Sequence, residues 1–384
     1  MTFSLTGRAA AMSLGVAFVV VAMPEAGAWQ LSPEATAAER GVAAVAGPLA
    51  KAINRGVFLG IPKIGKPVHE DITRRVLRCP IIEPNETRRA TGCEPDTRDH
   101  EAGVRWNDDP GFKFLPGRGK YFGCRAGKTV RAVTQPWCWA RVFRHGENAA
   151  ARGVRLTGRN GNLLVRSHFG DLQFPHAMAL EDGESPEQTW RAIMAWMEFT
   201  WRTATGDDGF ESRRLVNELP IDGFAERFRY NPGWRIQDLF ALDNTGAHRA
   251  KVIQRIAFGS LLHVVQDSFA AGHVDRAPPT PGATCAGWRA LGEIREFHSY
   301  SRQDSHKHGL ADTPAALHEH EASTSPNVID VVRTLGILWR SQVPWEQARP
   351  YLACVFALAH DARPSSPGDG YMPDAPRSPN ESGG

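Results

Sequence analysis

The sequence lacks an excess of either charge, because its 384 residues hold 45 Lys and Arg against 42 Asp and Glu. A net charge of +3 argues against a dedicated nucleic-acid binder that works by bulk positive charge. An apolar fraction of 42% and a charged fraction of 23% are typical of a globular protein and exclude a disordered chain. Some catalytic motifs are also missing: we find no serine nucleophile elbow, no phosphate-binding glycine loop and no dinucleotide-binding fingerprint.

Long apolar runs are missing after the N-terminal segment, so we predict no later membrane span. Residues 1–28 have the pattern of a secretion signal: Arg8, then an apolar stretch over residues 9–23, then the small residues Ala26-Gly27-Ala28 at a cleavage site. Cleavage there leaves Trp29 as the mature N-terminus, and an uncleaved membrane anchor is the alternative. We therefore predict a secreted or periplasmic protein.

Cysteines are few, and their spacing matches no zinc-finger pattern. All six follow the predicted cleavage site, and an even number in an exported chain indicates disulfides. Several pairings are open. Short loops favour Cys79–Cys93 and Cys124–Cys138, which leaves Cys285 with Cys354.

Convincing strand patterns and internal repeats are missing too, whereas helical patterns dominate. We predict an all-α fold: one domain over residues 29–362, with an irregular, disulfide-pinned insertion at about 79–162 and a disordered tail over 363–384. The predicted helices cover residues 33–55, 71–77, 185–203, 247–271, 325–340 and 344–360.

The most informative segment contains His263, Asp267 and His273. His263 and Asp267 are four residues apart, so on a helix they share one face and can bind one metal ion. His273 follows Gly272, where we expect the helix to end, and can serve a second ion. Asp267 lies between them and can bridge two ions through its two oxygens, an arrangement suited to phosphodiester chemistry.

A closed zinc site needs more imidazoles and carboxylates from elsewhere in the chain. Candidates are His69 at a helix start, Asp108 in a constrained loop, His168, and the pair His308 and Asp312 with the same four-residue spacing. The amine and carbonyl of Trp29 could form a chelating pair, or Trp29 could be a core aromatic. Asp109 is an alternative to Asp108, His298 to His308, and Asp304 to Asp312.

The order of these candidate ligands along the chain resembles the order of the zinc ligands in the superfamily of bacterial zinc-dependent phospholipases C and fungal single-strand-specific nucleases. The specific part is the His-x3-Asp-x5-His run at residues 263–273, and the resemblance spans about residues 29–312. It implies an all-α fold with three zinc ions. One ion would take Asp108, His168, His263 and Asp267, a second Trp29, His69 and Asp267, and the third His273, His308 and Asp312.

The resemblance implies a secreted zinc-dependent phosphodiester hydrolase in which Asp108 and Asp267 are the candidate catalytic residues. The preferred substrate is a phospholipid at a membrane surface, cleaved as by a phospholipase C. A single-strand nuclease or nucleotidase acting on single-stranded nucleic acid is the alternative within the superfamily. A non-catalytic binding protein on the same scaffold is the alternative outside it. We predict no stable protein partner.

Overall fold

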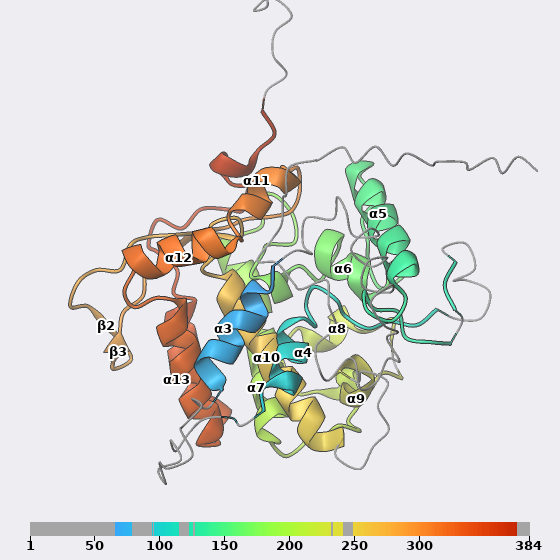
Figure 1. Cartoon of the computed structure of the whole chain (residues 1–384), viewed down its shortest axis with the longest axis horizontal. Coiled ribbons are helices and arrows are strands. Elements are labelled where there is room, and N and C mark those ends of the chain that lie inside the picture. Colours follow the sequence, from blue (N-terminus) through green and yellow to red (C-terminus); the bar gives the residue numbers. More distant parts are fainter. Residues whose placement is uncertain are drawn as a thin grey trace, which may run out of the picture.

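The computed structural model describes residues 66–78, 94, 96–114, 123–125, 127–231, 233–240 and 249–374 (Figure 1). Its elements, in chain order, are α3 (Val68–Leu77), α4 (Arg98–Val104), α5 (Pro136–Ala151), α6 (Leu163–Phe169), η2 (Phe174–His176), α7 (Pro186–Thr205), η3 (Val216–Glu218), α8 (Phe224–Arg227), α9 (Ile236–Phe240), α10 (Arg249–Asp267), β1 (Val274–Arg276), β2 (Thr284–Cys285), β3 (Trp288–Arg289), β4 (Ile294–Phe297), α11 (Ser305–Leu310), α12 (Pro314–Ser323), α13 (Val328–Arg340), α14 (Trp345–Val355) and η4 (Asp369–Tyr371).

The described part is helix-rich, as the sequence indicates, with α10 at its centre (Figure 1). Helices α3, α4, α7 and α13 all pack against α10. The prediction of no strands was wrong in detail, because β1 pairs with β4 and β2 with β3, both antiparallel. These ribbons are two to four residues long, too short to show an alternating sequence pattern.

Two glycines bring α4 against α10. A Cβ on Gly103 would lie 2.4 Å from the carbonyl oxygen of Ile256, and one on Gly259 would lie 2.4 Å from that of His100. Only glycine permits this backbone approach. Because α4 leads directly into the turn that carries Asp108, the close contact positions that carboxylate beside α10.

Helix starts follow the sequence signals closely. Ser185 caps α7 and Asn327 caps α13, each in a capping box, and α3 covers the predicted residues 71–77. Of the helix ends, those of α3 at Leu77 and α13 at Arg340 agree with the prediction, and those of α10 and α14 do not. α10 stops at Asp267 rather than near residue 271, and Arg276 donates hydrogen bonds to the carbonyl of Ser268 just beyond that end.

The C-terminal part also differs from the prediction. α14 ends at Val355 and not near residue 360, because the chain then pairs with β4 through the bond from Ala359 N–H to the Ile294 carbonyl. The predicted disordered tail is ordered at least to residue 374. Ser366 bonds to buried Glu296, and Lys307 pairs with Asp374 over 2.6 Å.

The predicted irregular insertion contains regular structure. Within residues 79–162, α4 and the 16-residue α5 are helical, so the expectation of sustained irregularity was wrong there. α5 starts at Pro136 and buries Trp139, Val142 and Phe143 in a second apolar cluster with α6. A Cβ on Gly146 would lie 2.6 Å from Val165, so the glycine that obscures the helical pattern allows α6 to pack there.

Two of the predicted disulfides are present. Cys124–Cys138 ties the preceding loop to α5, and Cys285–Cys354 ties β2 to α14. The third pair, Cys79–Cys93, lies outside the described residues, as do the predicted signal, Trp29 and the predicted helix over 33–55. In the described part, no helix has the length and apolar character that a bilayer crossing requires.

Candidate metal centre

Five segments bring imidazoles and carboxylates together around the C-terminal end of α10. His69 comes from α3, Asp108 from the turn after α4, His168 from α6 and His176 from η2, and they meet His263 and Asp267 of α10. All six residues are buried. Their ligand atoms form three overlapping groups: His69, Asp108 and His263; Asp108, His168 and His176; and His176, His263 and Asp267.

Asp267 directs its two oxygens to different partners. Oδ1 lies 3.2 Å from Nε2 of His69. Oδ2 lies 2.9 Å from Nε2 of His263 and 3.1 Å from Nδ1 of His176. The pair with His69 joins α10 to α3. The pair with His263 lies within α10, and the pair with His176 joins α10 to η2. This carboxylate is therefore arranged as a bridge between two neighbouring positions.

Acceptors on the far side of the rings fix their orientation. Nδ1 of His263 donates to the Val104 carbonyl over 2.5 Å, and Nδ1 of His168 donates to the Leu164 carbonyl over 2.8 Å. Nδ1 of His69 lies 2.6 Å from Oε1 of Gln266. Each of these bonds leaves Nε2 facing the carboxylates, which is how metal-binding histidines are held.

A second set contains His273, His308 and Asp312. Nε2 of His308 lies 3.4 Å from Oδ2 of Asp312, and Nε2 of His273 lies 3.6 Å from the same oxygen. Nδ1 of His273 donates to the His176 carbonyl over 2.7 Å, which links this set to the first. His308 and Asp312 are brought together by α11 and the turn after it, at the predicted four-residue spacing.

The spacing of the donors fits zinc. Ligand atoms about 2.0–2.2 Å from a tetrahedral ion lie roughly 3.4 Å from one another. The carboxylate–imidazole contacts of Asp108 and Asp267 run from 2.9 to 3.9 Å, and those of Asp312 are 3.4 and 3.6 Å. In every group the ligand atoms lie within 4.8 Å of one another. Neutral imidazoles and carboxylates are also the donor types that zinc takes. Several buried groups could therefore hold a metal ion.

The ionisation of this centre reflects its mixed charges. Burial opposes protonation of His69, but the hydrogen bond and charge of Asp267, with Asp108, raise its pKa from 6.5 to about 9. Burial also opposes ionisation of Asp267, yet the charges of His263 and His273 and the hydrogen bond from His176 hold its pKa well below the usual range. The centre thus favours the ionised form of the Asp267 carboxyl.

Tyr300 lies between the two sets. Its ring centroid is 6.2 Å from that of His176, 6.1 Å from His273 and 5.2 Å from His308. Burial and the charges of Asp267, Asp108 and Asp312 raise the pKa of its hydroxyl well above the usual range, so it stays a phenol. Tyr300 was not among the sequence candidates.

His176 is the main residue that the sequence analysis missed. It follows Phe174-Pro175 in a single turn of 3-10 helix, where no helical spacing relates it to another ligand. Asn107 holds this turn in place, since its Nδ2 donates to the carbonyls of Pro175 and Ser260. The one available clue was that His176 follows the candidate His168 closely in the sequence. In the structure both imidazoles lie beside Asp108, each 3.7 Å from its Oδ1.

The three alternative ligands lie elsewhere. Asp109 is buried, but it accepts from the backbone of Ala132 and pairs with Arg131 over 3.3 Å. Asp304 caps the start of α11 through the N–H groups of His306 and Lys307. His298 donates from Nδ1 to the Gly272 carbonyl and lines a separate cavity. None of the three belongs to a metal-binding group among the described residues.

No family model, no curated protein and no solved structure matches the chain.

Proposed function

We propose that this chain is an exported zinc-dependent phosphodiester hydrolase and that its substrate is a phospholipid, cleaved as by a phospholipase C. The observation that carries the proposal is the divided environment of Asp267, with Oδ1 toward His69 and Oδ2 toward His263 and His176. A carboxylate shared in this way suits closely spaced ions. The resemblance of the 263–273 run to the zinc-dependent phospholipases C and nucleases supports the same reaction.

Different residues of the chain would bind the metal ions and orient the substrate. His69, Asp108, His168, His176, His263 and Asp267 would hold the first ions, and His273, His308 and Asp312 a further one. Zinc bound there would supply Lewis acidity toward a phosphoryl oxygen and a nucleophilic water near neutral pH. Tyr300, kept as a phenol between the two sets, would donate a hydrogen bond to the phosphoryl group and orient it.

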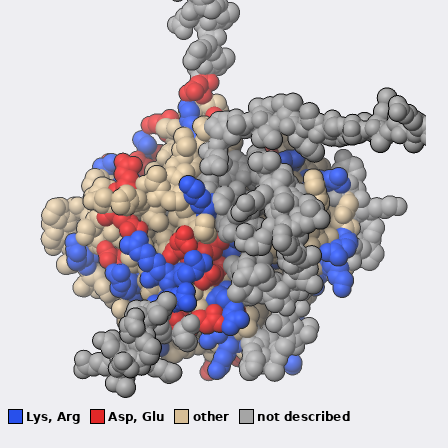
Figure 2. Space-filling view, viewed as in Figure 1, with Lys and Arg blue, Asp and Glu red and all other residues tan. Residues whose placement is uncertain are grey.

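Surface charge favours lipid over nucleic acid. On the described part of the face in Figure 2, Lys and Arg side chains alternate with Asp and Glu. Arg74 pairs with Asp71 and Glu101, and Arg75 pairs with Glu321. Such a mixed face lacks the single-sign field that draws a polyanion toward a binding groove. The two disulfides fit an oxidising compartment, in keeping with export.

Measurements of bound zinc and of activity on two substrates test the proposal. We expect the purified chain to retain about three zinc ions and to release phosphocholine from phosphatidylcholine vesicles. Acid-soluble nucleotides from single-stranded DNA, with no release from vesicles, would instead identify the nuclease. A chain that holds no zinc and cleaves neither substrate would be a binding protein on this scaffold.

A further inference from the structure

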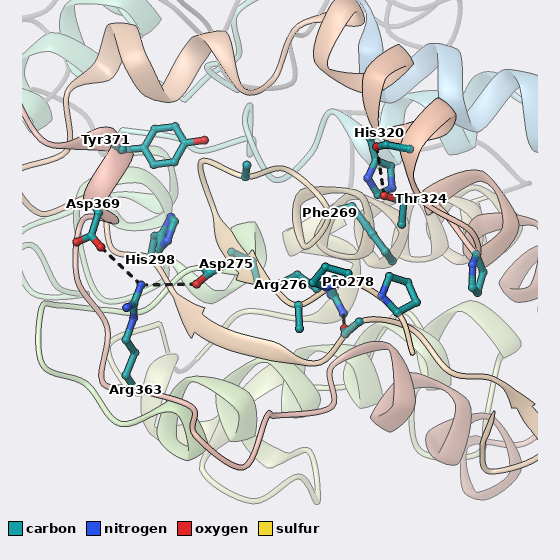
Figure 3. A pocket seen from close by; sticks show the side chains of 18 residues that line it. Phe269, Asp275, Arg276, Pro278, His298, His320, Thr324, Arg363, Asp369 and Tyr371 are labelled. Carbon is teal, nitrogen blue, oxygen red and sulfur yellow. Dashed lines mark hydrogen bonds and ion pairs between the residues drawn. The ribbon is translucent and has the colours of Figure 1, made fainter. Parts of the chain in front are cut away.

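The segment that carries His273 also forms a wall of a separate cavity of about 620 Å³ (Figure 3). Ala271, Val274 and Asp275 line it, and none of the lining residues belongs to a metal-binding group. A volume of this size fits a small organic molecule. The cavity has two distinct ends: Arg363, Asp275, Asp369 and Tyr371 lie at one, and Phe269, Pro278, Arg276 and His320 at the other (Figure 3).

The first end has an excess of negative charge. The guanidinium of Arg363 lies 3.6 Å from Asp275 and 4.0 Å from Asp369, and it also pairs with buried Glu296. Three carboxylates thus share one cation. The side chain of Asp369 is 92% exposed, so its charge is available to a ligand at the cavity rim.

His298 adds a hydrogen-bond acceptor at the same end. Its side chain is 3% exposed and lines the cavity. Nδ1 donates to the Gly272 carbonyl over 3.1 Å, so in the neutral ring Nε2 carries a lone pair. In the described part of the chain, Nε2 has no hydrogen-bond partner. Gly368 fixes the ring, because a Cβ there would lie 2.5 Å from it.

The other end does not suit an anion, although Arg276 lies there. Its guanidinium donates to the carbonyls of Ser268, Gly292 and Val355 and to the Ser268 hydroxyl. These bonds occupy Nε and both Nη atoms, and the group stacks over Phe269 at 4.6 Å. Pro278, Pro279 and Pro326 supply apolar wall, next to the polar side chains of His320, Ser323 and Thr324.

We propose that this cavity binds an organic ammonium ion with an apolar body. The ammonium N–H groups bond to Nε2 of His298 and to Asp369. The ring of Tyr371, 5.7 Å from that of His298, covers the positive charge. The apolar body lies against Phe269 and Pro278. An acceptor nitrogen and surplus carboxylates select a cation that can donate, over a neutral or anionic molecule of the same shape.

Calorimetric titration of the whole chain at neutral pH tests the proposal with three probes of similar shape: 2-phenylethylamine, 2-phenylethanol and phenylacetate. We expect the amine to bind at least about tenfold more tightly than the alcohol, and phenylacetate more weakly still. Asp369→Asn should weaken amine binding several-fold. His298→Phe removes the acceptor and should weaken it by more than about tenfold.

Asp374→Asn is the matched control. This carboxylate lies in the same C-terminal segment, is 90% exposed and pairs with Lys307 outside the cavity, so amine binding should not change. Asp267→Asn should leave it unchanged too, which separates the cavity from the metal centre. Preference for phenylacetate, equal binding of amine and alcohol, or no binding of any probe would overturn the proposal, as would an amine affinity unaffected by Asp369→Asn in a folded variant.

Discussion

His69 and His100 are equally buried, at 1% and 0% exposed, and α3 and α4, which carry them, both pack against α10. Their pKa values nevertheless move in opposite directions. Burial lowers the pKa of His100 to about 3, and Arg255 and Arg340 add to the effect. For His69, Asp267 and Asp108 outweigh the same effect of burial and raise the pKa to about 9.

The surroundings of the two rings explain the difference. Neither ring nitrogen of His100 has a hydrogen-bond partner in the described part of the chain, and its ring meets Trp339 and Phe258 edge-on. His69 has Gln266 on one nitrogen and Asp267 on the other. Burial alone therefore does not mark a histidine as functional. A carboxylate beside the ring is what distinguishes the candidate metal ligand His69 from His100, and three substitutions test this view.

The largest effect should come from Asp267→Asn, which removes the charge that distinguishes His69 from His100. We expect the substitution to reduce kcat/KM by at least about a thousandfold, or roughly 4 kcal/mol, and to lower the bound zinc. In the metal-free protein the pKa of His69 should fall from about 9 toward or below 6.5, because burial then dominates. Turnover, metal analysis and NMR titration measure the three quantities.

Asp109→Asn is the control for that substitution. Asp109 is an equally buried carboxylate next to Asp108, but its partners are Arg131 and the backbone of Ala132. The variant should lose stability and keep both zinc and turnover. If Asp267→Asn retained full activity, or if both variants lost zinc equally, Asp267 would not be the bridging ligand.

Two ligand pairs of the candidate centre could be predicted from helical spacing, whereas His69, Asp108 and His168 were candidates only as imidazoles and carboxylates elsewhere in the chain. His263 and Asp267 share a turn of α10, and His308 and Asp312 have the same spacing in and after α11. His176 and Tyr300 could not be found in this way. Both lie in irregular segments, and only tertiary contacts such as those of Asn107 bring His176 to Asp108.

The fold, too, could be predicted only where the local sequence determines it. Starts of helices are encoded locally by caps such as Ser185 and Asn327, and were predicted to within a few residues. The two ends that were predicted wrongly depend on partners outside the helix: Arg276 at the end of α10, and the pairing of Ala359 with Ile294 after α14. In α5, Gly146 weakens the local helical pattern, and its reason is the approach of α6.

The second prediction concerns the close contact between α4, which carries His100, and α10, which carries Asp267. In Gly103→Ala the new Cβ would lie 2.4 Å from the Ile256 carbonyl, so α4 would have to move away from α10. We expect the free energy of unfolding to fall by about 1–3 kcal/mol, despite the better helix propensity of alanine. Zinc affinity should fall with it, since Asp108 follows α4. Chemical denaturation with and without zinc measures both effects.

Gly233→Ala provides the comparison, because a Cβ at Gly233 would meet nothing within 4 Å. Its unfolding midpoint and zinc affinity should equal those of the parent chain. A Gly103→Ala variant as stable as Gly233→Ala would show that α4 can shift without cost, and the close contact would then not be what positions Asp108.

The third prediction concerns His100 itself. Its pKa is about 3 in the folded chain and 6.5 in the unfolded one, so between these values only the unfolded state binds the proton. The free energy of unfolding therefore falls as pH falls from 6.5 toward 3, by up to about 1.4 kcal/mol per pH unit.

His100→Phe removes this contribution and keeps the apolar contacts with Trp339 and Phe258. In metal-free protein the variant should lose less stability than the parent between pH 6.5 and 4, whereas His318→Phe, at an exposed position of α12, should follow the parent curve. Parallel curves for the parent and His100→Phe would mean that the buried ring finds a proton-accepting partner, and the contrast with His69 would then be one of degree.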